Sequence, residues 1–162
     1  MDVLAAFVAS ALHTHFSAGE IQVLVRELGV RPEEIALRPN TISEFAQAVA
    51  QWFADRGRID ELLRAVVDGR ENIARRWAKE VLHRGFTRSQ RDDLLRELRV
   101  SPGDVILNPP SDESHAWEIV EYFIRRSSLW QLVRGIVLKA GASQQPQRSF
   151  IDLPQLAAGP RG

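Results

Sequence analysis

The stretch FSAGEIQVLVRELGVRP, residues 16–32, is closely repeated seventy residues later as FTRSQRDDLLRELRVSP, residues 86–102. Both stretches share the Phe, a hydroxyl residue after it, the Arg-Glu-Leu and the Val-x-Pro. Aligned with itself at this offset of seventy, the chain matches without a gap over the whole of residues 1–70, and about a quarter of the positions are identical. An ungapped match of this length predicts two tandem copies of one domain, residues 1–70 (the first half) and 71–140 (the second half).

The apolar residues of each half recur with helical spacing. Ser17-x-x-Glu20 and Thr87-x-x-Gln90 are capping boxes that predict the start of a second helix in each half. Pro32 and Pro102 favour a short third helix, and no stretch alternates as a strand would. We therefore expect an all-α fold with about five helices per half. Most aromatic residues are predicted to be core: Phe7, Phe16, Trp52, Phe53, Trp77, Phe86, Trp117, Tyr122 and Phe123.

The composition is that of a soluble globular protein without thiol chemistry. Of 162 residues, 44% are apolar, 26% are charged and none is cysteine. The apolar run near the N-terminus is too short to cross a bilayer, and no Lys or Arg precedes Arg26, whereas a secretory leader needs positive charge. We expect a cytoplasmic protein with no membrane partner.

No catalytic or ligand-binding constellation is visible. The histidines His13, His15, His83 and His115 lack the spacing of a zinc site, and no glycine-rich phosphate loop is present. His13 and His83 lie at equivalent positions in the two halves, which favours a structural role. The sequence thus predicts no enzyme, no cofactor and no metal.

Charge is distributed unequally between the halves. The first half has ten acids and seven bases, net −3, whereas the second has ten acids and twelve bases, net +2. The excess base is concentrated in one stretch, the basic cluster: Arg75, Arg76, Lys79, Arg84, Arg88 and Arg91. This cluster is either a solvated helix face or an anion-seeking surface.

Complementary charges steer association, so the basic cluster could meet acids of a first half, in a second copy of the chain or in a partner of the same fold. The candidate acids are Glu33, Glu34, Asp60 and Glu61. Such head-to-tail contacts do not close by two-fold symmetry and can grow into open chains.

Residues 141–162 (the tail) are rich in Gly, Gln and Pro, which is typical of a linker or a disordered end. Within this tail, SFIDLPQL carries four apolar side chains, Phe150, Ile151, Leu153 and Leu156. This is more apolar than a spacer requires, so the alternative is a short docking peptide.

The first half resembles the bacterial effector-associated domains, which belong with the bacterial death-like domains. The resemblance covers about residues 16–66: a Phe-Ser entry to a Leu-rich helix, the Glu34-Ile35 step, and a long helix with aromatic residues leading into Gly57-Arg58-Ile59-Asp60-Glu61-Leu62. The second half keeps the entry but has Ser127-Ser128 in place of Gly57-Arg58 and Gln131 in place of Glu61. Neither half has the Asn-Pro step with which the family often closes.

The resemblance implies a non-catalytic adaptor that joins a sensor to an effector in a bacterial conflict or defence system, by association of like domains. On this interpretation the partners are proteins with a similar helical domain, self-association included, and nucleic acid is not expected. The alternative is a helical nucleic-acid-binding or regulatory protein that uses the basic cluster from Arg75 to Arg91.

Overall fold

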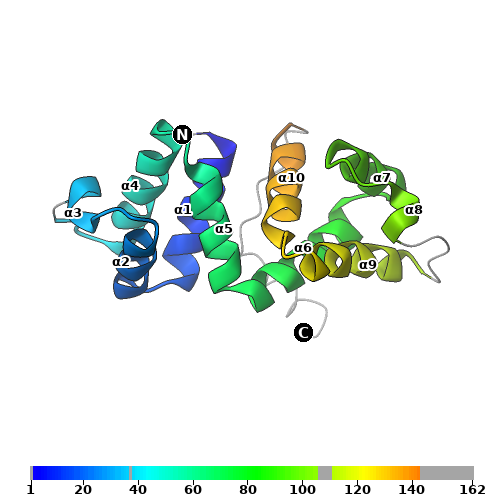
Figure 1. Cartoon of the computed structure of the whole chain (residues 1–162), viewed down its shortest axis with the longest axis horizontal. Coiled ribbons are helices and arrows are strands. Elements are labelled where there is room, and N and C mark those ends of the chain that lie inside the picture. The colour runs from blue at the N-terminus through cyan, green and yellow to red at the C-terminus, as the bar shows by residue number, and fades with distance from the viewer. Residues whose placement is uncertain (1, 37, 106–110, 143–162) are drawn as a thin grey trace.

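The computed structural model describes residues 2–36, 38–105 and 111–142, which form ten helices and no strand (Figure 1). The all-α prediction is therefore confirmed. The first half contains α1 (Val3–His15), α2 (Ala18–Glu27), α3 (Pro32–Ile35), α4 (Ile42–Asp55) and α5 (Ile59–Gly69). The second half contains α6 (Glu71–Gly85), α7 (Arg88–Glu97), α8 (Pro102–Val105), α9 (Asp112–Arg125) and α10 (Leu129–Ala142).

Side-chain oxygens cap several helix starts, and two of these caps were predicted from the sequence. Ser17 and Thr87 each form a complete capping box at the start of α2 and α7. Thr41 and Ser111 cap α4 and α9 through their side-chain oxygens. Asp2 caps α1 in the same way, with Oδ1 accepting from the Ala5 N–H at 2.8 Å. α2, α3 and α4 have the bounds of α7, α8 and α9 at the offset of seventy, and α5 and α10 also start at this offset.

The helix ends recur at the same offset. Gly29 and Gly57 have φ of 81° and 66°, and the residues seventy positions later, Arg99 and Ser127, have φ of 63° and 53°. These are the positive-φ residues of the described chain, and each follows the last turn of a helix, where a left-handed residue lets backbone N–H groups bond the final carbonyls. The backbone therefore turns alike in both halves, with glycine in the first and side-chain-bearing residues in the second.

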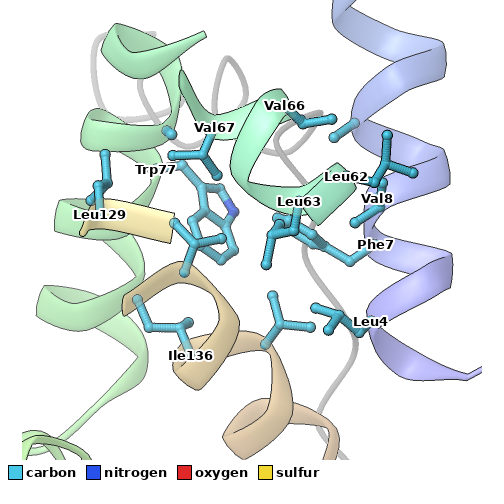
Figure 2. Packing of buried hydrophobic residues seen from close by; sticks show 14 of the residues in the cluster. Leu4, Phe7, Val8, Leu62, Leu63, Val66, Val67, Trp77, Leu129 and Ile136 are labelled. Carbon is cyan, nitrogen blue, oxygen red and sulfur yellow. The ribbon is translucent and has the colours of Figure 1, made fainter. Parts of the chain in front are cut away.

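The two halves lie side by side in Figure 1, and their buried residues form one continuous apolar cluster. Figure 2 shows the junction, where Leu62, Leu63 and Val67 of α5 gather around Phe7 and Trp77. The rings of Phe7 and Trp77, which occupy equivalent positions, lie 5.1 Å apart between centroids. The junction buries apolar side chains from both halves, and burial of this kind is the main favourable term in folding.

Two further features join the halves. Arg70 is the single residue between α5 and α6 and serves as the C-cap of one and the N-cap of the other. Arg134 of α10 donates from Nε to Oδ1 of Asp60 on α5 at 2.9 Å. The division into two domains, 1–70 and 71–140, stays a prediction, because one core runs through both.

The predicted core aromatics are placed as follows. Phe53 and Phe123 are buried, which confirms that prediction. The prediction for Trp117 is wrong: this side chain is 44% exposed on α9, because its position faces outward between Lys79 and solvent. The tail beyond Ala142 lies outside the described residues, and so do its proposed docking side chains Phe150, Ile151, Leu153 and Leu156. In the part of the chain that the structure describes, no helix is both long and apolar enough to cross a membrane.

Candidate protein-interaction surfaces

Most of the basic cluster is neutralised within the second half. Arg75 and Lys79 of α6 both donate to Oε1 of Glu121 on α9, Lys79 at 3.0 Å. Arg84 pairs with Glu80 one turn earlier, with Nε and Oε2 3.0 Å apart. Burial would raise the pKa of Glu121, but the hydrogen bonds from Lys79 and Arg75 outweigh this and lower it. Glu121 therefore stays ionised and compensates two of the predicted cations.

Arg91 does not belong to any surface, so its assignment to an exposed interaction site needs correction. Its side chain is 1% exposed and lies between α6, α7 and α9. The guanidinium donates to Oδ1 and Oδ2 of Asp112 at 2.7 and 2.8 Å. It also donates to the backbone carbonyls of Leu82 at 2.6 Å, Phe86 at 2.9 Å and His83 at 3.1 Å. A buried arginine is tolerated because all sides of the fork find acceptors.

His115 completes this buried network. Nδ1 lies 3.2 Å from Nη1 of Arg91 and accepts from it, and Nε2 lies 3.5 Å from Oδ1 of Asp92. Burial of the ring, together with the nearby charge of Arg91, lowers the pKa of His115. The hydrogen bonds from Arg91 lower the pKa of Asp112 to about 2. Oδ2 of Asp112 also lies 3.4 Å from Nδ1 of His83.

The first half has apolar side chains at the three central positions of this network. Ile21 corresponds to Arg91, Ile42 to Asp112 and Phe45 to His115 at the offset of seventy. At the offset of seventy, the sequence shows Arg91 in place of Ile21. From this single replacement we expected Arg91 to lie on the surface. The signal that would have found the network is that three apolar residues of the first half are all replaced by polar residues at the equivalent positions of the second half.

The predicted acids are exposed or half-buried, and three of the four form ion pairs. Glu34 pairs with Arg31 at 3.3 Å, and Glu61 pairs with Arg58 at 2.9 Å. The hydrogen bonds from Arg58 lower the pKa of Glu61. Asp60 bonds Arg134 across the two halves, as described above, whereas Glu33 is exposed on α3. The acids and the basic cluster are not brought together within one chain.

The surface of α6, α7 and α9 carries exposed cations and one large exposed aromatic side chain. Arg76 and Arg88 are exposed and form no ion pair with any residue in the described ranges. Trp117 is the large exposed aromatic there, with Nζ of Lys79 5.1 Å from its ring centroid. An exposed tryptophan is typical of protein-binding surfaces, where Trp, Tyr and Arg carry most of the binding energy.

The first half has a groove between α2 and the end of α5. Its volume is about 910 Å³, and it is open to solvent along its length. Val23, 51% exposed, and Leu24 line its α2 side, and Ala65 and Gly69 line its α5 side. Arg70 lies over the ring of Phe16 at 4.1 Å and bonds Glu20 at 2.5 Å at one end of the groove. The volume of the groove lies within the range of ligand-binding sites.

The described residues include no group of three or more His, Asp or Glu side chains that could hold a metal ion. No family model, curated protein or solved structure matches the chain.

Proposed function

We propose that the chain is a non-catalytic adaptor built from two death-like helical bundles of the effector-associated type, which joins a sensor to an effector in a bacterial conflict or defence system by association of like domains. One observation carries the proposal: helices with recurring bounds and recurring left-handed turns bear different outer surfaces in the two halves. A shared backbone with two surfaces suits a protein that binds two partners at once.

The surfaces differ in kind. The first half offers the groove with exposed Val23, and the second offers Trp117 beside Lys79, with Arg76 and Arg88 exposed on α6 and α7. Aromatic and arginine side chains act as anchors in interfaces, whereas a groove receives side chains from its partner. In this proposal each half recruits its own partner, and the adaptor works in the cytoplasm.

The nucleic-acid alternative is supported less by this arrangement. Arg91 is buried, and Arg75, Lys79 and Arg84 are paired with carboxylates. Arg76 and Arg88 remain, and two phosphate contacts would give only weak binding with a shallow salt dependence. A titration with duplex DNA at 50 and 200 mM salt tests this, since steep loss of a tight complex would support the alternative.

The test of the proposed function is a pull-down from the native host with the full chain as bait. We expect proteins that carry a similar helical domain, and each should bind the purified chain directly in size-exclusion chromatography. Val23→Asp should remove one partner and Trp117→Ala the other, while each variant keeps the partner of the other half. If no direct partner has such a domain, or if both variants lose the same partner, the two-partner adaptor is wrong.

A further inference from the structure

The groove between α2 and α5 corresponds to a closed contact in the second half. At the equivalent place α10 packs on α7, and Gly135 leaves the room for this: a Cβ there would lie 3.0 Å from Cδ1 of Leu94 and 3.3 Å from Cδ2 of Leu98. The first half has Ala65 at the position of Gly135, and Ala65 is half-buried and lines the open groove. A contact that the second half makes within itself is therefore left open in the first.

The two halves also differ in the charges at this place. In the second half, Nζ of Lys139 on α10 lies 2.8 Å from Oε1 of Glu97 on α7. The first half keeps the acid as Glu27 but has Gly69 where the second half has Lys139. Glu27 is exposed, lines the groove and forms no ion pair with any residue in the described ranges. The cation that the second half supplies from its own helix is therefore missing from the first.

The other acids of the groove lie at different degrees of compensation. Glu20 is already bonded to Arg70, as described above. Asp68 of α5 is exposed, and its ion pair with Arg64 is loose, with Nε and Oδ2 3.8 Å apart between two side chains that are both more than half exposed. The groove therefore presents uncompensated negative charge next to the exposed apolar side chain of Val23.

We propose, on the basis of the proposed function, that the partner of the first half inserts a basic amphipathic helix into this groove. One face of the helix brings apolar side chains to Val23 and Leu24, and a Lys or Arg beside that face pairs with Glu27. Amphipathic helices bind apolar grooves in this way, and complementary charge fixes their register. In the second half the cation that meets the equivalent acid is itself on a helix. The ten residues of α2 rise about 15 Å, which a partner helix of about three turns matches.

Two synthetic peptides probe the groove directly. Both are helical and about 14 residues long, or about four turns, with leucines along one face. One peptide has Lys at the positions that flank this face, and the other has Glu at the same positions. Fluorescence anisotropy measures the binding of each labelled peptide to the full-length chain at low and at high salt. We expect the Lys peptide to bind at least roughly tenfold more tightly than the Glu peptide at low salt, and the difference to shrink at high salt, because salt screens exposed charges.

Three variants of the chain locate this preference. Glu27→Lys should reduce it about fivefold, since one attraction is replaced by a repulsion. The matched control is Glu33→Lys, which makes the same change of charge at an exposed acid of α3 outside the groove and should leave the preference intact. Gly69→Lys places on α5 the residue that α10 carries at the equivalent position, so it should compensate Glu27 within the chain and weaken the Lys peptide. A Cβ at Gly69 would lie 3.5 Å from the ring of Phe16, an ordinary contact, and circular dichroism checks that each variant is folded.

The peptides and the native partner are read separately. No binding of the Lys peptide, equal affinity for the two peptides, a preference that survives Glu27→Lys, or one that Glu33→Lys reduces as much would each overturn the basic helix as the occupant. Those results leave the adaptor function standing, because that function is tested by the capture of a protein with a similar helical domain. A failed capture with the peptide preference intact would remove the adaptor function alone.

Discussion

The two halves of the molecule hold their second and fourth helices together in opposite ways. In the first half Ile21 and Phe45 are buried and pack as apolar side chains. In the second half, Arg91 and His115 occupy the equivalent positions and contact each other, and Asp112 is the anion that pairs with Arg91. The same backbone is therefore compatible with an apolar contact between these helices and with a charged one, provided that every buried donor and acceptor is hydrogen-bonded.

The comparison extends to the end of the first helix in each half, whose last carbonyls lack partners within the helix. In the first half Arg70 donates from Nε to the His15 carbonyl at 3.1 Å. In the second half Arg91 donates to the carbonyls of His83 and Phe86. An arginine therefore donates to the last carbonyls of the first helix in both halves. The two arginines are at different positions in their halves, so the requirement for a donor recurs but the residue that supplies it does not.

The largest effect is expected where the halves are alike. Phe53 and Phe123 occupy equivalent places late in α4 and α9, and both are buried. Each substitution by Ala should cost about 3–5 kcal/mol of the free energy of unfolding, through lost transfer energy and the cavity left behind. Urea denaturation at 25 °C measures this. A loss below about 1 kcal/mol for one of them would show that the halves do not share a core position there.

The second effect tests where the halves differ. Arg91→Ala should cost about 3 kcal/mol, because it leaves three backbone carbonyls without their donor and removes the cation that pairs with Asp112. The matched control is the triple variant Arg91→Ile, Asp112→Ile and His115→Phe, which transplants the residues of the first half.

We expect the triple variant to lose less than Arg91→Ala, because it leaves no unpaired Asp112 charge and fills the space with apolar side chains, although the three backbone carbonyls lack their donor in both variants. Both are measured as shifts in the urea midpoint. If the triple variant is as unstable as Arg91→Ala, the two contacts are not interchangeable, and the surrounding residues have adapted to charge in the second half.

A third prediction concerns acid. The lowered pKa of His115 means that the folded state favours the neutral ring, whereas the unfolded chain takes up a proton near pH 6.5. The stability that this contributes is present above pH 6.5 and falls as the pH drops below it. Asp112 adds a second loss between pH 3.8 and about 2, because its pKa is lowered by Arg91. The charges around His115 are those of Arg91, Arg88, Asp92 and Asp112.

His115→Phe should therefore flatten the decline in unfolding free energy between pH 7 and pH 5, by less than the cost of Arg91→Ala. The matched control is His13→Phe, which removes an exposed histidine of the first half. Urea melts at a series of pH values provide the measurement. A decline that survives His115→Phe would place the acid sensitivity outside the buried network.

Features that depend on residues close in sequence could be predicted, whereas features that depend on contacts between distant helices could not. Caps such as Ser17 and Thr87 satisfy backbone groups three residues away, so the helix starts could be predicted from the neighbouring letters alone. The burial of Arg91 depends on Asp112 and on carbonyls of α6, which come from two other helices. A charged residue on a predicted helix is expected to lie at the surface. Only the packing of three helices shows that Arg91 is buried. The same holds for the groove, which depends on the spacing of α2 and α5.

The smallest effect that we predict is a gain in stability, at the turn between α9 and α10. Ser127 has a φ of 53°, and the equivalent residue of the first half, Gly57, has a φ of 66°. The backbone hydrogen bond is the same in both turns, because each of these N–H groups donates to the carbonyl of the residue three positions earlier. A left-handed conformation costs a residue with a Cβ about 1–2 kcal/mol, partly offset by the greater freedom of glycine in the unfolded chain. Ser127→Gly should therefore stabilise the protein by about 1 kcal/mol, and Gly57→Ser should destabilise it by about as much.

A Cβ on Gly57 would meet no atom within 4 Å, so the effect of Gly57→Ser reports the backbone conformation free of any clash. Opposite shifts of the urea midpoint are the expected result; shifts of the same sign would mean that the two turns, despite their equal geometry, are held by different interactions.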